Sequence, residues 1–207
     1  VAGYKSTFSV TAKSGEKILI TTLTREQALQ TAKVDGHILI TDATVLPEKG
    51  KCTLLSLGKN KFDYVLYPSA KGWKQQTIEV PAVNPVFKVD KAGSRRMTVT
   101  VEPNNNKQVQ EYFLQINYVG DVAMAFINNS MVLDHFYYGA PWTIGLKRFE
   151  SRMAEKGMDF YFRPLMKDAA YLKDLPQSAL RDWNNKRSVL SIDSVNVLPE
   201  YRTQIIF

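Results

Sequence analysis

The chain has 207 residues, of which 44% are hydrophobic and 23% are charged, and its formal net charge is +7 at pH 7. This composition is ordinary for a globular protein, with room for one large domain or two small ones. No apolar run reaches the length that crosses a bilayer, and the scattered basic residues match no nucleic-acid-binding motif. We therefore expect neither a membrane span nor a nucleic-acid partner.

Short strands separated by turn residues dominate the first part of the chain. Thr24–Thr31 is expected to be a helix, because Thr24 can cap it and Gln27 lies where a capping box needs a glutamine. A second short helix is expected at 177–183. The glycine-containing link at Gly58–Lys59 is interpreted as a hairpin turn between two strands. The expected strands are 17–23, 37–41, 53–56, 62–67, 76–80, 86–89, 97–101 and 112–118.

The segment Val119–Phe149 is the most informative part of the sequence. Residues 122–127 are apolar at every position, which favours a strand buried on both faces within a sandwich. Asn128-Asn129 offers the tolerance of positive φ that a tight hairpin requires, and 131–136 then returns as the second strand. Gly139-Ala140-Pro141 breaks this strand, and Trp142–Leu146 begins another.

Many short strands and few helices indicate a mostly β fold, either a β-sandwich or a jelly roll. Pro81 and Pro85 mark a semi-rigid connector. We therefore expect a small β-rich unit at 1–80, followed by a sandwich domain at 81–207.

The segment Val119–Phe149 resembles the C-terminal part of bacterial beta-galactosidase-like proteins related to glycoside hydrolase family 35, especially the Bacteroidetes group. The resemblance rests on Gly120-Asp121, on Phe136-Tyr137 and on the run from Pro141-Trp142 to Phe149, with Asn129 where the family usually has glycine. It is weaker before Val119. It implies that 81–207 is a galactose-binding-like jelly roll.

The resemblance implies a non-catalytic accessory region that packs on the catalytic domain of the same parent chain and contacts galactose-containing glycans. The alternative is a free-standing carbohydrate-binding or cell-surface adhesion module, and a third class is a small independent enzyme. The chain starts at Val1, and we expect a processed chain or a piece of a longer protein. By resemblance alone, the parent is expected in the periplasm or at the cell surface.

Aromatic residues around Gly139–Pro141 are the main site candidates. Sugars stack their C–H faces on aromatic rings while polar neighbours bond their hydroxyls, so Tyr137, Tyr138 and Trp142 are the carbohydrate-binding candidates. The competing interpretation places Phe136 and Trp142 in the core or at a domain interface. If the strand is extended, one of Tyr137 and Tyr138 should be accessible.

Catalytic and metal chemistry have weaker support. The paired glutamates of the resembled family lie in a barrel that this chain lacks, so Glu111, Asp121, Asp134 and Asp159 are expected in turn, cap or surface roles. No cofactor is expected. Galactose-binding-like sandwiches often hold structural calcium, for which Asp121 and Asp134 are the candidates.

The single cysteine, Cys52, is expected as a small buried residue in a strand.

Overall fold

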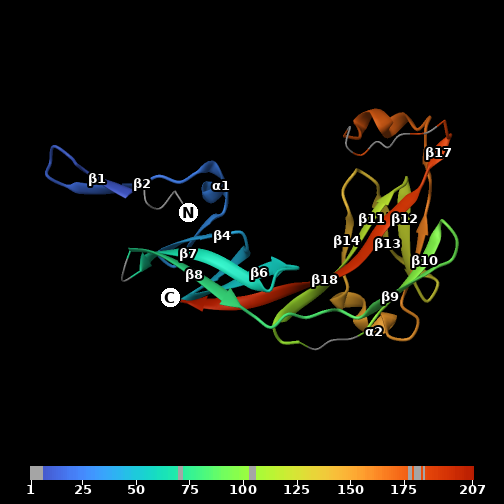
Figure 1. The fold of residues 1–207 in the computed structure, drawn as a ribbon, viewed down its shortest axis with the longest axis horizontal. Helices are drawn as coiled ribbons and strands as arrows, with labels where there is room; N and C mark the ends of the chain where they lie inside the picture. The colour runs from blue at the N-terminus through green and yellow to red at the C-terminus, as the bar shows by residue number, and fades with distance from the viewer. Residues whose placement is uncertain (1–6, 70–71, 103–105, 177–178, 180–182, 184) are drawn as a thin grey trace. The chain divides into compact units, whose positions relative to one another are not determined.

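Antiparallel strands make up most of this computed structural model, which describes residues 7–69, 72–102, 106–176, 179, 183 and 185–207 (Figure 1). The chain forms two compact units: unit 1 is Val1–Ala82 with Tyr201–Phe207, and unit 2 is Val83–Glu200. The mostly β class is therefore confirmed. The structure also assigns the last residues of the chain to unit 1, whereas the sequence pattern had grouped them with 81–207.

Unit 1 contains a four-stranded sheet of order β3-β4-β7-β8, a β1–β2 hairpin, and β5 and β6, with the end of β18 beside β6. Its buried side chains include Leu39, Leu54, Phe62 and Val65. The elements are β1 (Thr7–Thr11), β2 (Lys17–Thr21), α1 (Arg25–Leu29), β3 (Thr31–Val34), β4 (His37–Thr41), β5 (Thr44–Glu48), β6 (Lys51–Leu57), β7 (Lys61–Ser69), β8 (Gly72–Glu79) and β18 (Ser191–Ile206).

The predicted capping box begins helix α1. Gln27 N donates to Thr24 Oγ1 at 3.2 Å, and Thr24 N donates to Gln27 Oε1 at 3.0 Å. The helix ends sooner than expected, at Leu29, because Thr31 already begins β3 and pairs with Ile40. The expected helix at 177–183 falls largely outside the described residues.

The predicted hairpin at Gly58–Lys59 is wrong. Strand β6 lies between β5 and β18, whereas β7 lies between β4 and β8. Lys59 Nζ donates to Asp42 Oδ2 and Asn60 Nδ2 donates to Val80 O, each at 2.7 Å. A turn signal shows where one strand ends, but it does not decide whether the flanking strands pair.

Cys52 lies in β6 and is fully buried, as the sequence predicted. Burial raises the pKa of its thiol, so the side chain stays protonated and apolar at neutral pH. The nucleophilic role of a thiol needs a histidine beside it, and the His37 ring is stacked on Phe207, with the ring centroids 4.5 Å apart.

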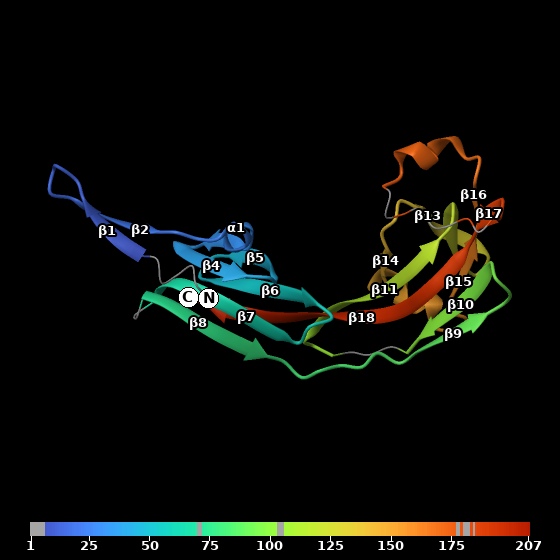
Figure 2. The same cartoon turned by 45° about the horizontal axis from the view of Figure 1, so that its top comes forward.

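Unit 2 is built from a five-stranded sheet of order β13-β12-β15-β10-β9 and from β14, β11 and the first part of β18 (Figure 2). One hydrophobic core takes side chains from both sheets, as in a β-sandwich. The elements are β9 (Phe87–Lys91), β10 (Arg96–Val101), β11 (Val109–Val119), β12 (Val122–Ile127), β13 (Ser130–Phe136), β14 (Trp142–Gly145), η2 (Lys147–Phe149), α2 (Glu150–Met153), β15 (Met158–Phe162), β16 (Leu165–Met166), η3 (Ala170–Asp174) and β17 (Ser188–Val189).

Strand β12 is buried on one face only, which corrects the prediction of a strand buried on both. Ala123, Ala125 and Ile127 lie in the core, whereas Val122, Met124 and Phe126 are only half-buried. These three side chains are therefore not part of the core of unit 2.

The β12–β13 hairpin has the predicted two-residue turn. Ile127 pairs with Ser130, and both residues between them have positive φ, 49° at Asn128 and 64° at Asn129. Two positive φ values are the signature of a type I′ turn, whose twist matches that of the flanking strands.

Asn129→Gly is expected to leave stability unchanged or to raise it by a few tenths of a kcal/mol, because glycine enters this conformation without a Cβ clash. Urea unfolding measures the change. The matched variant Asn129→Val should destabilise, since a β-branched residue disfavours positive φ. A loss above about 1 kcal/mol for Asn129→Gly would contradict the turn assignment.

Among the described residues, no helix is long and apolar enough to cross a membrane.

Candidate functional site

The aromatic segment between β13 and β14 divides between core and surface. Trp142 and Tyr137 are 6% and 8% exposed, whereas Tyr138 and Phe136 are 56% and 68% exposed. The prediction that one of the two tyrosines is accessible is confirmed for Tyr138. Phe136 lies outside the core of this chain, so its predicted place in the core is wrong.

Trp142 and Tyr137 are held from several sides. The Trp142 ring stands edge-on to Phe160 at 5.6 Å and is stacked on His135 at 5.4 Å, measured between ring centroids. The Tyr137 hydroxyl donates to Ala179 O at 2.8 Å. A ring enclosed in this way has little face left for a sugar, so Tyr138 is the one of the three carbohydrate candidates with surface to offer.

His135 connects the exposed ring to the core. Its ring lies 5.4 Å from that of Tyr138, and its Nδ1 is 2.8 Å from the Tyr118 hydroxyl. Burial lowers the pKa of His135, an effect that the nearby Asp134 carboxylate partly opposes. Burial also raises the pKa of Tyr118 well above its usual range, so the Tyr118–His135 contact joins two neutral groups at pH 7.

We expect the thermal stability of the protein to fall as the pH is lowered from 7 to 5. An unfolded histidine has a pKa of about 6.5. Because the folded pKa of His135 is lower, the unfolded state binds more protons in this range and stability is lost as the pH falls. The His135→Phe variant should lose stability less steeply from pH 7 to 5 and match the wild-type slope from pH 7 to 8. Equal slopes from pH 7 to 5 would contradict this role of His135.

A cleft of about 280 Å³ lies beside the loop Gly139–Pro141. Its polar side chains come from neighbouring strands: Asn117 from β11, and Asp193 and Ser194 from β18. Asn117 Nδ2 donates to Ser194 Oγ at 2.7 Å, which fixes both side chains. The cleft therefore presents an amide, a hydroxyl and a carboxylate next to the predicted aromatic segment.

Gly139 allows the loop to pass close to the rest of unit 2. Its φ is 93°, and a Cβ at this position would lie 2.5 Å from Ala179 Cβ. Any side chain here would displace the loop that borders the cleft, because neither the backbone conformation nor the space accommodates one.

The calcium candidate Asp121 already has protein partners. Its Oδ1 accepts a hydrogen bond from the Tyr171 hydroxyl at 2.6 Å, and its Oδ2 lies 3.4 Å from an Arg163 guanidinium nitrogen. Burial and this bond raise the pKa of Tyr171 to about 12. Asp134 is an exposed residue of β13. Within the part of the chain that the structure describes, no three His, Cys, Asp or Glu side chains form a group able to hold a metal.

Other acids also have structural contacts. Glu111 Oε1 accepts hydrogen bonds from Tyr112 N and Lys147 N, each at 2.8 Å, and Asp159 Oδ1 accepts one from Thr98 Oγ1 at 2.6 Å. No pattern in the sequence distinguished Glu200 from other acids. Burial raises the pKa of its carboxyl, with a further contribution from the charge of Glu111.

One face of the β12–β13 hairpin carries an apolar patch, here called the outer face: Val122, Met124, Phe126, Met131 and Phe136. Val122 pairs with Phe136, and Phe126 with Met131, across the two strands. Met131 and Phe136 are exposed and the other three are half-buried. The exposed Asp134 pairs with Met124 on the same face, so the apolar side chains surround a carboxylate. Exposed apolar residues gathered in this way are found at interaction sites.

No family model, curated protein or solved structure matches the chain.

Sequence patterns identified the loop of the cleft but missed its polar side. Asn117 and Asp193 lie in long strands, where they resemble ordinary polar positions. Ser194 follows Asp193 in the same strand and carried no site signal of its own. The adjacency of β11 and β18 brings the three together.

Proposed function

We propose that the chain is a non-catalytic accessory region of a beta-galactosidase-like glycoside hydrolase, which contacts carbohydrate at the cleft beside Tyr138. The observation that carries the proposal is the polar group Asn117, Asp193 and Ser194, which lines the cleft together with Tyr137 and Gly139. Tyr138 stands between these last two residues in the chain, and its side chain is exposed. An aromatic face and convergent hydrogen-bonding groups are the two components of a sugar site.

A second part of the proposal concerns the outer face. We propose that it packs on the catalytic domain of the same parent chain. This favours the accessory region over a free-standing adhesion module, because a module without a partner would leave Met131 and Phe136 in water.

We extend the proposal to the fold of unit 2. A sandwich in which both sheets share one core supports a galactose-binding-like jelly roll for unit 2. We also propose an exported parent protein, on the resemblance alone.

The purified chain is expected not to hydrolyse aryl β-galactosides. Glycoside hydrolysis needs two carboxyl groups placed across the scissile bond, and Glu111, Asp121 and Asp159 all accept hydrogen bonds within the fold. A nitrophenyl galactoside assay measures this. Turnover that survives repurification and disappears in Glu200→Gln would overturn the non-catalytic assignment.

Carbohydrate contact is tested by following amide NMR signals during titration with methyl β-galactoside. Signals of the cleft, such as the side-chain amide of Asn117, should shift, and Tyr138→Ala should abolish the shift while leaving the thermal midpoint unchanged. The matched control is Phe87→Ala, which removes an exposed ring on β9. Strand β9 is the edge of its sheet opposite to β13, the strand that precedes Tyr138. A wild-type protein whose cleft signals do not move would contradict the proposal.

Packing on a parent domain is tested with the full reading frame. The region encoded beside this chain is expressed separately, and its affinity for the chain is measured by calorimetry. Phe136→Ser should weaken binding and Phe87→Ser should not. Equal effects of the two changes, or an adjacent region without a glycosidase barrel, would count against the proposal.

A further inference from the structure

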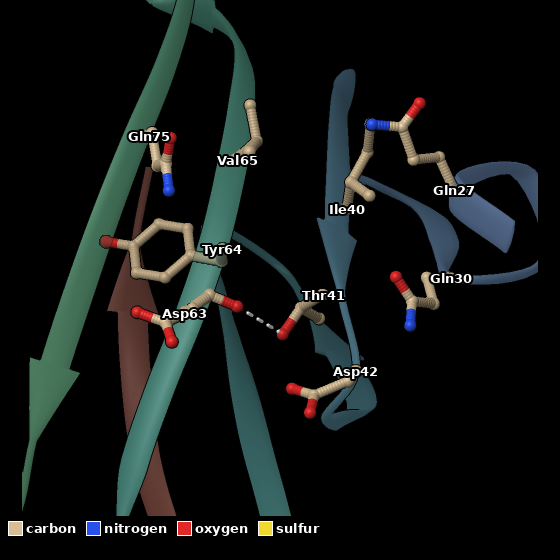
Figure 3. Close-up of a pocket in the computed structure, with 9 residues that line it drawn as sticks. All are labelled: Gln27, Gln30, Ile40, Thr41, Asp42, Asp63, Tyr64, Val65 and Gln75. Carbon is tan, nitrogen blue, oxygen red and sulfur yellow. Dashed lines mark hydrogen bonds between the residues drawn. The ribbon is translucent and has the colours of Figure 1, made fainter. Parts of the chain in front are cut away.

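Unit 1 contains a separate hollow of about 270 Å³ between helix α1 and the sheet β4-β7-β8 (Figure 3). Its floor is apolar: Ile40 on β4 pairs with Val65 on β7, and both are buried. Val65 in turn pairs with Gln75 on β8, so the floor ends at an amide. All the residues that line this hollow belong to unit 1.

Gln27 contributes a buried donor to this hollow. The residue is 5% exposed, and its Nε2 is buried with no hydrogen-bond partner among the described residues. The orientation of the amide is fixed chemically, because Thr24 N donates to one of its atoms at 3.0 Å and only the oxygen accepts. The nitrogen is therefore the free end, and a buried donor without a partner is costly for the fold.

Further polar groups line the hollow. Gln30 and Gln75 supply exposed amides, and Asp42 and Asp63 supply carboxylates, as Figure 3 shows. Asp42 is bonded to Lys59, and Asp63 accepts the Thr77 hydroxyl, which holds each carboxylate in place. Among the described lining residues, the two carboxylates are the only charged groups. Lys59 offsets the charge of Asp42, and the charge of Asp63 still disfavours an anionic ligand.

We propose that this hollow binds a neutral polyhydroxyl compound the size of a single sugar ring. The apolar floor of Ile40 and Val65 accepts the C–H face of such a ring. A ligand hydroxyl oxygen accepts from Gln27 Nε2, and other hydroxyls donate to Asp42 and Asp63. A ligand of this class satisfies donors and acceptors at once, because each hydroxyl group is both.

The experiment uses Gln27→Glu, which removes the donor and keeps an oxygen that caps Thr24. Glutamate is the other residue used at this position of a capping box, so the helix should form normally. The 207-residue chain is titrated with D-galactose, D-glucose and myo-inositol while the side-chain amide signals are followed by NMR. We expect at least one probe to shift the Gln27 signal of the wild type and to bind at least tenfold more weakly to Gln27→Glu.

Two controls make the result specific. Gln27→Glu should keep the wild-type thermal midpoint, and Tyr138→Ala, in unit 2, should leave this binding unchanged. That control separates the inference from the proposed function, because either site can fail without the other. A Gln27 signal that none of the three probes moves would overturn the inference. A signal that acetate moves instead would also overturn it, since the site would then take anions.

Discussion

Replacing Trp142 by alanine is expected to cost about 3–5 kcal/mol of unfolding free energy. The ring lies in the core of unit 2 and contacts Phe160 and His135. Truncation would leave a cavity in close-packed surroundings, and a loss of this size is a large share of the 5–15 kcal/mol that typically stabilises a domain. Thermal or urea unfolding followed by circular dichroism measures the loss.

Tyr138→Ala is the matched control, because it removes an exposed aromatic ring four positions earlier in the same segment. It should change stability by no more than about 0.5 kcal/mol. If Trp142→Ala instead left the melting temperature unchanged and abolished galactoside binding, Trp142 would be a sugar platform. We expect the opposite: Trp142→Ala should destabilise the protein, and Tyr138→Ala should abolish galactoside binding while stability is kept.

Gly157→Ala is expected to cost about 2–5 kcal/mol. Gly157 has a φ of 74°, and the left-handed conformation costs other residues about 1–2 kcal/mol. A Cβ here would also clash with the Val99 carbonyl oxygen, and overpacking adds about 1–3 kcal/mol. Val99 cannot retreat easily, because β10 pairs with β9 on one side and β15 on the other.

Gly93→Ala separates these two contributions. Gly93 has a similar φ of 77°, but nothing lies within 4 Å of the Cβ that alanine would add. The control should therefore lose only the conformational part, about 1–2 kcal/mol. Unfolding of both variants in urea gives the difference, and equal losses would show that the β10 backbone yields to the new methyl group.

Local chemistry in the sequence predicted several features of the fold. The Thr24–Gln27 capping box depends on residues three positions apart, and the Asn128-Asn129 turn depends on two neighbours that tolerate positive φ. Apolar residues and turn residues located β4 and β12 at their observed bounds and several other strands within a few residues, but no strand was predicted at β1, β3, β5, β15, β16, β17 or β18. These features need no information from distant parts of the chain, which is why the sequence by itself determined them.

Long-range pairing decided what the sequence left open. Periodicity tells which residues of β12 share a face, but only the tertiary structure shows that Ala125 faces the core and Phe126 does not. Strand β6 meets β18 instead of its neighbour β7, because pairing depends on partners far along the chain. For the same reason Asn117 meets Ser194, and the Gln27 amide nitrogen lies buried without a partner. Both sites combine groups from separate elements, and the packing of those elements brings the groups together.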